Sequence, residues 1–501
     1  MNAILKALVA AVLFLPMGAV AFAPLRVVVS DDTQEPLTLD PFVEFGEKNH
    51  TIIQQVLEGL ARFDPDGNIV PALAVSWEQL TPLQLRFHLR AGVRFHDGEP
   101  FDSRSVRFSL EKYIDPATGY PGRGFFASIE RVEVVDAQTV DVVTRYPDGV
   151  LLRRFAGLIT LVPPAYYGRV GGAEFSRRPI GTGPFKFDHW TAGREIVLAA
   201  NRGYWEKGLP KIDELTFRFI PTKDQVKALL SGAVDLVMEM PGTATLQVKK
   251  NPATTVLKKE TLYTVGATFN VSRWPLSDVR FRQALNYAVN RAELIRYDLL
   301  GNGTLVATLS LPGEVGHDPD LVPYPYDLKK AKGLLRELGV KTPLHLKTLL
   351  RLQQGNRTAL ILAKQFEELG VILDMETGTE SDLFKKFREQ EWDLAIAGMP
   401  DPTAHSSFIQ SILLYSKSPY SIFKSTDYDR RLEDFTSTMS QEEQEAKGRE
   451  LDRFIYSQAL SLFTYQRLRT YGIDRRLSFT PYMTGMPYFR SVEISSGARA
   501  Q

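Results

Sequence analysis

The chain has 501 residues, more than one hydrophobic core usually organises, so two or three lobes are expected. Hydrophobic residues make up 44% and the formal net charge is +1, which favours a globular protein and argues against a nucleic-acid binder, since that function needs a basic face. The sequence has no cysteine, so disulfides, thiolate catalysis, zinc–cysteine sites and a lipid anchor on an N-terminal cysteine are excluded.

The first predicted element is a cleavable secretory signal peptide at residues 1–21. Lys6 precedes an apolar run at 7–15, and Ala19-Val20-Ala21 fits a small-x-small cleavage site. The apolar run is too short to span a bilayer. No later stretch approaches 18 apolar residues, so we expect the mature protein to be soluble and periplasmic.

A turn-rich segment follows at 56–106. Within it, apolar and polar residues alternate strictly over 85–90, which predicts a half-buried strand. Gly67 and Gly98 each follow an aspartate, in pairs that favour tight turns. None of these residues is arranged for chemistry, so we interpret the segment as scaffold.

Helices and strands alternate through both halves of the chain. This alternation favours α/β lobes over a sandwich or a helix bundle. Helix starts are predicted at Asp102, Asp278, Asn290 and Asp327, further helices at 356–370 and 441–462, and strands at 26–30, 132–135, 140–143 and 215–219.

Several of these segments resemble motifs of the family 5 extracellular solute-binding proteins, which serve importers of peptides, nickel and related solutes. The resemblance runs from about residue 27 to 479 and keeps the family's order. Its motifs are 39–41, 56–106, 179–185, 278–285 with Asn290-Arg291, and 326–339. In the motif at 179–185, Gly181 and Gly183 predict a tight turn. A phosphate loop is not predicted, because no Lys-Ser/Thr follows the glycines.

The resemblance implies an α/β fold of two lobes, a type II periplasmic binding protein of the Venus-flytrap kind with an extra small domain inserted in the first lobe. Such lobes close on a ligand by a hinge motion. After the signal peptide at 1–21, we place lobe 1 at 22–54, 178–264 and 470–501, the inserted domain at 55–177 and lobe 2 at 265–469.

The resemblance also points to Asp401 as a ligand-binding residue. In similar peptide-binding members, an aspartate shortly after a Gly-Trp pair holds the α-ammonium of the ligand, a strong charge-assisted contact. Here Gly398-Met399 replaces Gly-Trp, and one residue instead of two precedes Asp401. The alternative is a turn aspartate before Pro402.

Further candidates for ligand contact lie in two loops. Glu44 and Phe45 stand where peptide binders have an acidic contact loop, and Tyr120 and Arg123 lie in a stretch rich in glycine and proline. Arg123 would suit a ligand carboxylate. The alternative for these four positions is an exposed surface loop. The remaining candidates are Asn270, Trp274, Met399 and His405, and the alternative for Asn270 is a structural role at the hinge.

We therefore predict the substrate-binding component of an ABC importer, with a short peptide as the first candidate ligand. The expected partners are the permease subunits at the inner membrane, and the expected state is a monomer. The sequence has no Gly-x-Ser-x-Gly elbow and no His-Glu-x-x-His, and its seven histidines are scattered. No catalytic residue, cofactor or metal is therefore expected. The alternatives are a secreted hydrolase using paired carboxylates and a ligand-sensing partner of a membrane receptor.

Overall fold

The computed structural model describes residues 24–28, 35–44, 46–351, 356–378 and 380–495. The predicted signal peptide at 1–21 lies outside these ranges. None of the helices within them combines the length and the apolar character that a membrane crossing requires.

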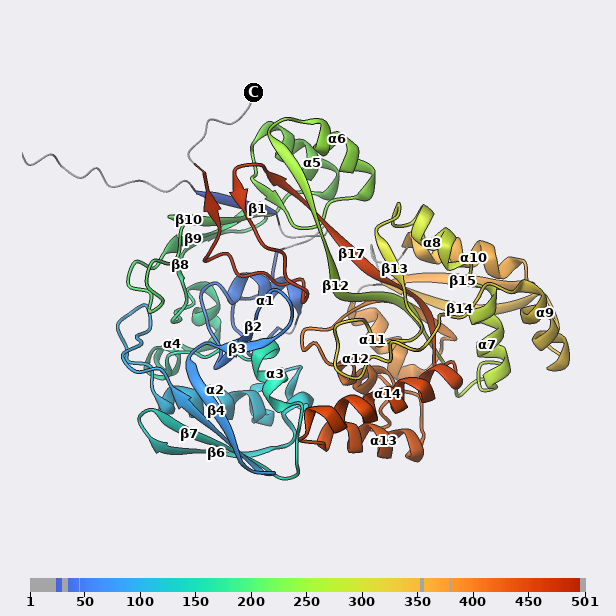
Figure 1. The fold of residues 1–501 in the computed structure, drawn as a ribbon, viewed down its shortest axis with the longest axis horizontal. Coiled ribbons are helices and arrows are strands. Elements are labelled where there is room, and N and C mark those ends of the chain that lie inside the picture. Colours follow the sequence, from blue (N-terminus) through green and yellow to red (C-terminus); the bar gives the residue numbers. More distant parts are fainter. Residues whose placement is uncertain (1–23, 29–34, 45, 352–355, 379, 496–501) are drawn as a thin grey trace, which may run out of the picture.

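The chain forms two lobes that share one large mixed sheet (Figure 1). In the described residues this sheet has eleven strands, ten of them in one continuous order and β13 (Gly303–Leu305) beside β17. The ten are β15 (Val371–Gly378), β14 (Leu344–Arg351), β16 (Leu394–Pro400), β12 (Thr254–Phe269), β17 (Ser461–Asp474), β11 (Leu236–Val237), β1 (Leu25–Val28), β10 (Glu214–Arg218), β9 (Glu195–Ala200) and β8 (Phe185–Thr191).

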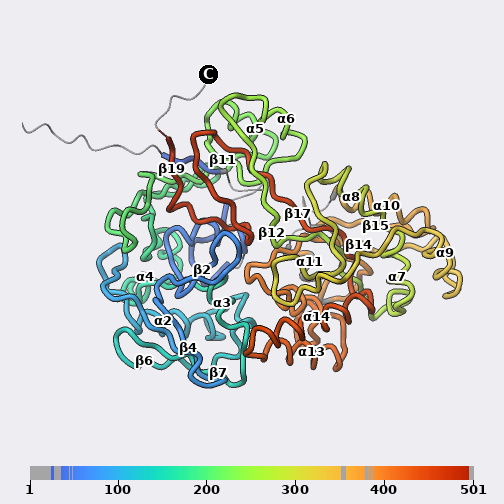
Figure 2. Tube along the Cα trace, viewed as in Figure 1, coloured from blue at the N-terminus to red at the C-terminus, as the bar shows by residue number. Residues whose placement is uncertain are grey.

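Two long antiparallel strands join the lobes. Figure 2 shows the trace of β12 and β17 passing from the blue and green lobe to the yellow and orange one. One half of the β12–β17 ribbon lies beside β11 and the other half beside β16, with a register irregularity between Glu260 and Thr264. The predicted crossovers at 264/265 and 469/470 fall inside these two strands. The exact division into domains stays a prediction.

The first lobe also contains a four-stranded antiparallel sheet covered by α2 (Ser103–Ile114). Its order is β4 (Ala74–Thr81), β5 (Gln84–Leu89), β7 (Thr139–Thr144) and β6 (Ile129–Asp136). Strand β5 confirms the predicted half-buried strand, because Phe87 and its alternate neighbours face inward. This sheet shares one hydrophobic cluster with Leu25 and Phe217 of the large sheet, so it has no separate core of its own among the described residues. The inserted domain therefore stays a prediction.

The first lobe also contains five further helices, and two of them, α1 and α3, contribute to the site described below. The helices are α1 (Glu47–Ile53), α3 (Leu151–Leu158), α4 (Pro164–Arg177), α5 (Thr222–Ser231) and α6 (Thr245–Lys250). The small strands are β2 (Ala61–Phe63), β3 (Ile69–Pro71), β18 (Leu477–Ser478) and β19 (Glu493–Ile494), and single 3₁₀ turns lie at η1 (Pro116–Thr118), η2 (Arg123–Phe126) and η3 (Gly242–Ala244).

The first helices of the second lobe pack around β14, β15 and β16 and the end of β12 (Figure 1). The later helices contribute Phe408, Phe435 and Ile455 to the hydrophobic cluster that they share with the first lobe. The helices are α7 (Val279–Ala288), α8 (Arg291–Tyr297), α9 (Leu328–Glu337), α10 (Asn356–Glu367), α11 (Glu380–Glu389), α12 (Ser407–Leu413), α13 (Thr426–Ser437) and α14 (Gln441–Ser457). The predicted starts are confirmed, since Asp278, Asn290 and Asp327 each accept a hydrogen bond from a backbone N–H of the first turn. The predicted helix at 441–462 was too long, because Ala459 adopts a positive φ and β17 begins at Ser461.

The motif at 278–291 contains two buried arginines, Arg282 and Arg291, that have structural roles. Arg282 donates to the carbonyls of Leu276, Ser277, Gln458 and Ala459. Arg291 donates to the carbonyls of Phe463, Asn286, Val289 and Tyr324 and to the Asn286 side chain. Each guanidinium thus ties a helix to the β17 side of the lobe and supplies donors to carbonyls that would otherwise be buried without partners.

Replacing Arg291 by lysine is expected to lower the free energy of unfolding by about 2–4 kcal/mol, because an ammonium cannot supply the planar fork of donors that these carbonyls accept. Urea denaturation measures the change. Arg280→Lys is the matched control on α7, since Arg280 is exposed and pairs with Asp278 at 2.8 Å, and it should cost no more than about 0.5 kcal/mol. Equal losses in the two variants would contradict this role for Arg291.

Candidate functional site

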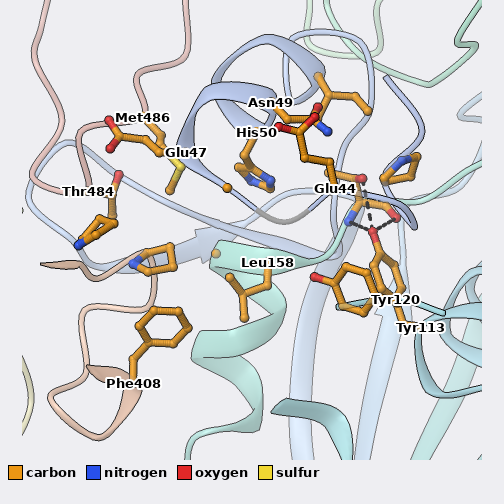
Figure 3. Close-up of a pocket in the computed structure, with 17 residues that line it drawn as sticks. Glu44, Glu47, Asn49, His50, Tyr113, Tyr120, Leu158, Phe408, Thr484 and Met486 are labelled. Carbon is orange, nitrogen blue, oxygen red and sulfur yellow. Dashed lines mark hydrogen bonds between the residues drawn. The ribbon is translucent and has the colours of Figure 1, made fainter. Parts of the chain in front are cut away.

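A pocket of about 620 Å³, partly open to solvent, lies where the two lobes meet (Figure 3). The first lobe supplies most of the wall, from the loop before α1, from α1 itself, from α2 and from the end of α3. The second lobe supplies Pro400, Pro402 and Phe408. The other lining residues are Pro41, Glu44, Gly46, Glu47, Asn49, His50, Ile53, Tyr113, Tyr120, Gly157, Leu158, Thr160, Thr484 and Met486.

Two tyrosines make a rigid aromatic side of the pocket. Tyr113 and Tyr120 pack edge to face, with ring centroids 4.9 Å apart. The Tyr113 hydroxyl donates to the Thr160 carbonyl at 3.2 Å and accepts from the Thr160 N–H at 3.2 Å, as the dashed lines in Figure 3 mark. Burial raises the pKa of Tyr113 to about 12, so the ring stays neutral and fixed.

The charged lining residues are acidic. Glu47 of α1 lies 2.6 Å from Nη1 of Arg469 on β17, and Arg469 also donates to the Gly485 carbonyl at 2.8 Å. Glu44 accepts a hydrogen bond from the Leu37 N–H at 3.0 Å. Neither lysine nor arginine is among the lining residues of the described chain. The pocket therefore favours neutral or cationic ligand groups over free carboxylates.

His50 lies on α1 next to the acidic side chains (Figure 3). Its removal from bulk water lowers its pKa to about 4. The imidazole is therefore neutral at physiological pH and can both donate and accept a hydrogen bond.

Acidification is expected to destabilise the fold through His50. The folded-state pKa of about 4 lies below the ordinary value of 6.5, so between these values only the unfolded chain binds the proton, and stability falls as the pH falls. Urea denaturation at about pH 7 and about pH 4.5 should show that the wild type loses about 1–3 kcal/mol more than His50→Gln. Equal losses in the two proteins would rule out this contribution.

Two of the predicted contact residues, Glu44 and Tyr120, line the pocket. Phe45 lies outside the described residues. Arg123 is exposed, Trp274 is 62% exposed, and neither contributes to the lining. The ligand-contact role of all these residues stays a prediction.

Asp401 is buried beside the pocket and does not line it, although its neighbours Pro400 and Pro402 do. Its side chain is 1% exposed and accepts hydrogen bonds from the Thr403 N–H at 2.7 Å, the Thr403 hydroxyl at 2.6 Å and the His405 N–H at 2.7 Å. Burial raises its pKa. The geometry matches the turn aspartate that the sequence allowed as the alternative, and an ammonium contact stays an untested prediction.

The remaining predicted residues hold the second lobe together. Asn270 donates to the Trp392 carbonyl at 2.7 Å and accepts from the Ser272 hydroxyl at 2.6 Å. Met399 is buried in β16. His405 is fully buried, stacks on Phe435 at 4.6 Å and contacts the Ser407 hydroxyl at 2.7 Å, and burial lowers its pKa well below the ordinary value.

Sequence reasoning missed the polar face of α1. Glu47, Asn49 and His50 all line the pocket, but the prediction stopped at the loop before them. The available signal was the run of polar residues at 47–51, which opens this helix three residues after Glu44. No group of three or more histidine, aspartate or glutamate side chains that could hold a metal ion occurs among the described residues.

Two α/β lobes joined by a paired ribbon, with a pocket between them, define a type II periplasmic binding protein fold. The family of bacterial extracellular solute-binding proteins, family 5 (middle), matches residues 68–420, and the chain belongs to this family.

Among curated proteins, the chain is 28% identical to the glutathione-binding protein GsiB of Escherichia coli O1:K1 / APEC over 326 residues, which are 64% of this chain and 63% of that protein. The match thus spans less than two thirds of the relative's length. The solved structure of AgaA from A. tumefaciens R10 in complex with agropinic acid is 25% identical, with a TM-score of 0.83 over 95% of this chain and 100% of that one.

A second solved structure supports the fold alone. It is DppA from Helicobacter pylori in complex with peptide STSA, 23% identical, with a TM-score of 0.84 over 95% of this chain and 98% of that one.

Proposed function

We propose that the protein is the substrate-binding component of an ABC importer, which captures a small solute between its lobes and delivers it to an inner-membrane permease. The observation that carries this proposal is a pocket with walls from both lobes, His50 and Tyr120 on one side and Phe408 on the other. A ligand that touches both walls stabilises the closed arrangement over the open one. The lining suits a small ligand, because it combines apolar and aromatic side chains with a few polar groups.

A short peptide is our first candidate ligand. The carboxylate of Glu44 fits a ligand ammonium, and the tyrosines, Ile53 and Phe408 offer apolar surface to side chains. The relatives named for glutathione and found with agropinic acid support a small organic solute. We propose Glu44 and Tyr120 as ligand-contacting residues on this basis.

We further propose that the protein acts in the periplasm as a monomer and without catalysis. The pocket does contain two carboxylates, but Glu47 is held in an ion pair with Arg469. Turnover of a chromogenic ester, peptide or glycoside by the purified protein would overturn the binding-only proposal. Light scattering after gel filtration measures the oligomeric state.

Native mass spectrometry of the purified full chain, followed by calorimetry with a panel of free di-, tri- and tetrapeptides, tests the proposed ligand class. A co-purified peptide, or micromolar binding of at least one panel member, is the expected result. If no peptide binds and a non-peptide solute co-purifies, the peptide proposal fails while the binding-protein proposal stands.

A further inference from the structure

Two neighbouring side chains of α1 reach the pocket without a hydrogen-bond partner among the described residues. Asn49 is 2% exposed, and its Oδ1 is buried without a partner. The amide nitrogen of Asn49 and the ring nitrogens of His50 likewise share no hydrogen bond with any described residue. Both residues line the pocket (Figure 3).

Asn49 differs in this respect from the other buried asparagines. Asn286 and Asn270 use both ends of their amides, and the partners are all protein groups. Buried polar side chains are nearly always hydrogen-bonded, because an unpaired one keeps the full cost of losing its water. Of the described lining residues, Asn49 is the single one with such a buried atom. A ligand group that enters the pocket would supply the missing hydrogen-bond partner of the Asn49 Oδ1.

The charge of the surroundings limits what that group is. Asn49 carries no charge, and the lowered pKa of His50 keeps its ring neutral at physiological pH. Glu44 lines the same pocket and disfavours a ligand carboxylate, whereas the charge of Glu47 is balanced by its ion pair with Arg469. The orphan Oδ1 accepts a hydrogen bond, so the ligand must supply an N–H or O–H, and the Asn49 nitrogen and His50 can bond to an acceptor next to it.

We propose that Asn49 and His50 form a subsite that binds a neutral amide group of the ligand. The ligand N–H donates to the Asn49 Oδ1, and the ligand C=O accepts from the Asn49 side-chain nitrogen or from His50. This inference rests on the proposed function, since it assigns the recognition chemistry of the same pocket. A site built this way rejects ligands that lack the amide, because its buried polar groups then stay unpaired.

The first test needs no ligand. Asn49→Leu keeps the size of the side chain and removes the unpaired amide, so the Tm of the ligand-free protein should rise by about 1–3 °C. Asn286→Leu is the matched control, since Asn286 is also buried in a helix but is fully hydrogen-bonded, and its Tm should fall. A lower Tm for Asn49→Leu would show a structural role and overturn the proposal.

The second test uses the tightest-binding peptide of the panel and its analogues, each N-methylated at one amide. Calorimetry should find one analogue that binds the wild type about tenfold more weakly, and this penalty should vanish in Asn49→Leu. The same penalty in both proteins would overturn the subsite. If no peptide binds the wild type, the peptide proposal fails, and the Tm comparison still decides whether Asn49 is held unpaired for a ligand.

Discussion

Gly157→Ala is expected to weaken ligand binding by about 5- to 100-fold, because the added methyl group keeps the lobes from meeting. Gly157 lies at the end of α3 in the first lobe and lines the pocket. A Cβ there would overlap the carbonyl oxygen of Pro402 and lie 3.0 Å from its carbonyl carbon, both in the second lobe. These are backbone atoms, which cannot turn aside as a side chain can.

Calorimetry with the tightest-binding peptide measures the affinity, and small-angle X-ray scattering with that peptide measures the radius of gyration, which should be larger in the variant. Gly168→Ala is the matched control, since a Cβ at this α4 position meets nothing within 4 Å. Wild-type affinity together with a wild-type radius in Gly157→Ala would contradict the closure argument.

Glu58→Leu is expected to lower the free energy of unfolding by about 3–5 kcal/mol, because it leaves three hydrogen-bond donors without their acceptor, and two of these donors are buried. The Glu58 carboxylate is buried and accepts from the Thr182 hydroxyl at 2.8 Å, the Tyr204 hydroxyl at 2.6 Å and the Trp205 indole N–H at 2.9 Å. Each of these hydrogen bonds joins residues more than a hundred positions apart in the sequence, so their loss acts on the whole lobe.

Urea denaturation measures this loss. Glu78→Leu provides the comparison, since Glu78 is an exposed glutamate on β4 that contacts His88 at 3.1 Å, and its substitution should change the free energy of unfolding by no more than about 0.5 kcal/mol. If Glu58→Leu were as mild as this control, the network around Glu58 would not be structural.

The scaffold could be predicted from the sequence because its signals are local. Asp278, Asn290 and Asp327 begin helices through contacts within one turn, and the alternation at 85–90 is set by one strand. The segment against which each motif packs in the folded chain could not be predicted from the sequence. Gly181 and Gly183 were expected to form a tight turn, and the structure adds that the backbone of Gln55 and Val56 packs where their Cβ atoms would be.

The candidate site was predictable only in part, since it depends on how loops meet in space. Glu44 and Tyr120, two of the predicted contact residues, line the pocket, and their contact with a ligand stays a prediction. Asp401 directly follows strand β16, and its carboxylate accepts hydrogen bonds from the backbone of its own turn at Thr403 and His405. The α1 residues escaped notice because a short polar helix start gives the same sequence pattern whether it faces water or a ligand.

The β12–β17 ribbon determines how freely the protein can close. Because both crossing segments belong to one two-stranded ladder, the lobes can rotate by twisting that ladder while its backbone hydrogen bonds stay intact on either side of the irregularity between Glu260 and Thr264. Closure then does not require the backbone hydrogen bonds between β12 and β17 to break. The open and closed states then differ mainly in the contacts between the lobes, and a solute shifts their populations only by as much as it binds one state more tightly than the other.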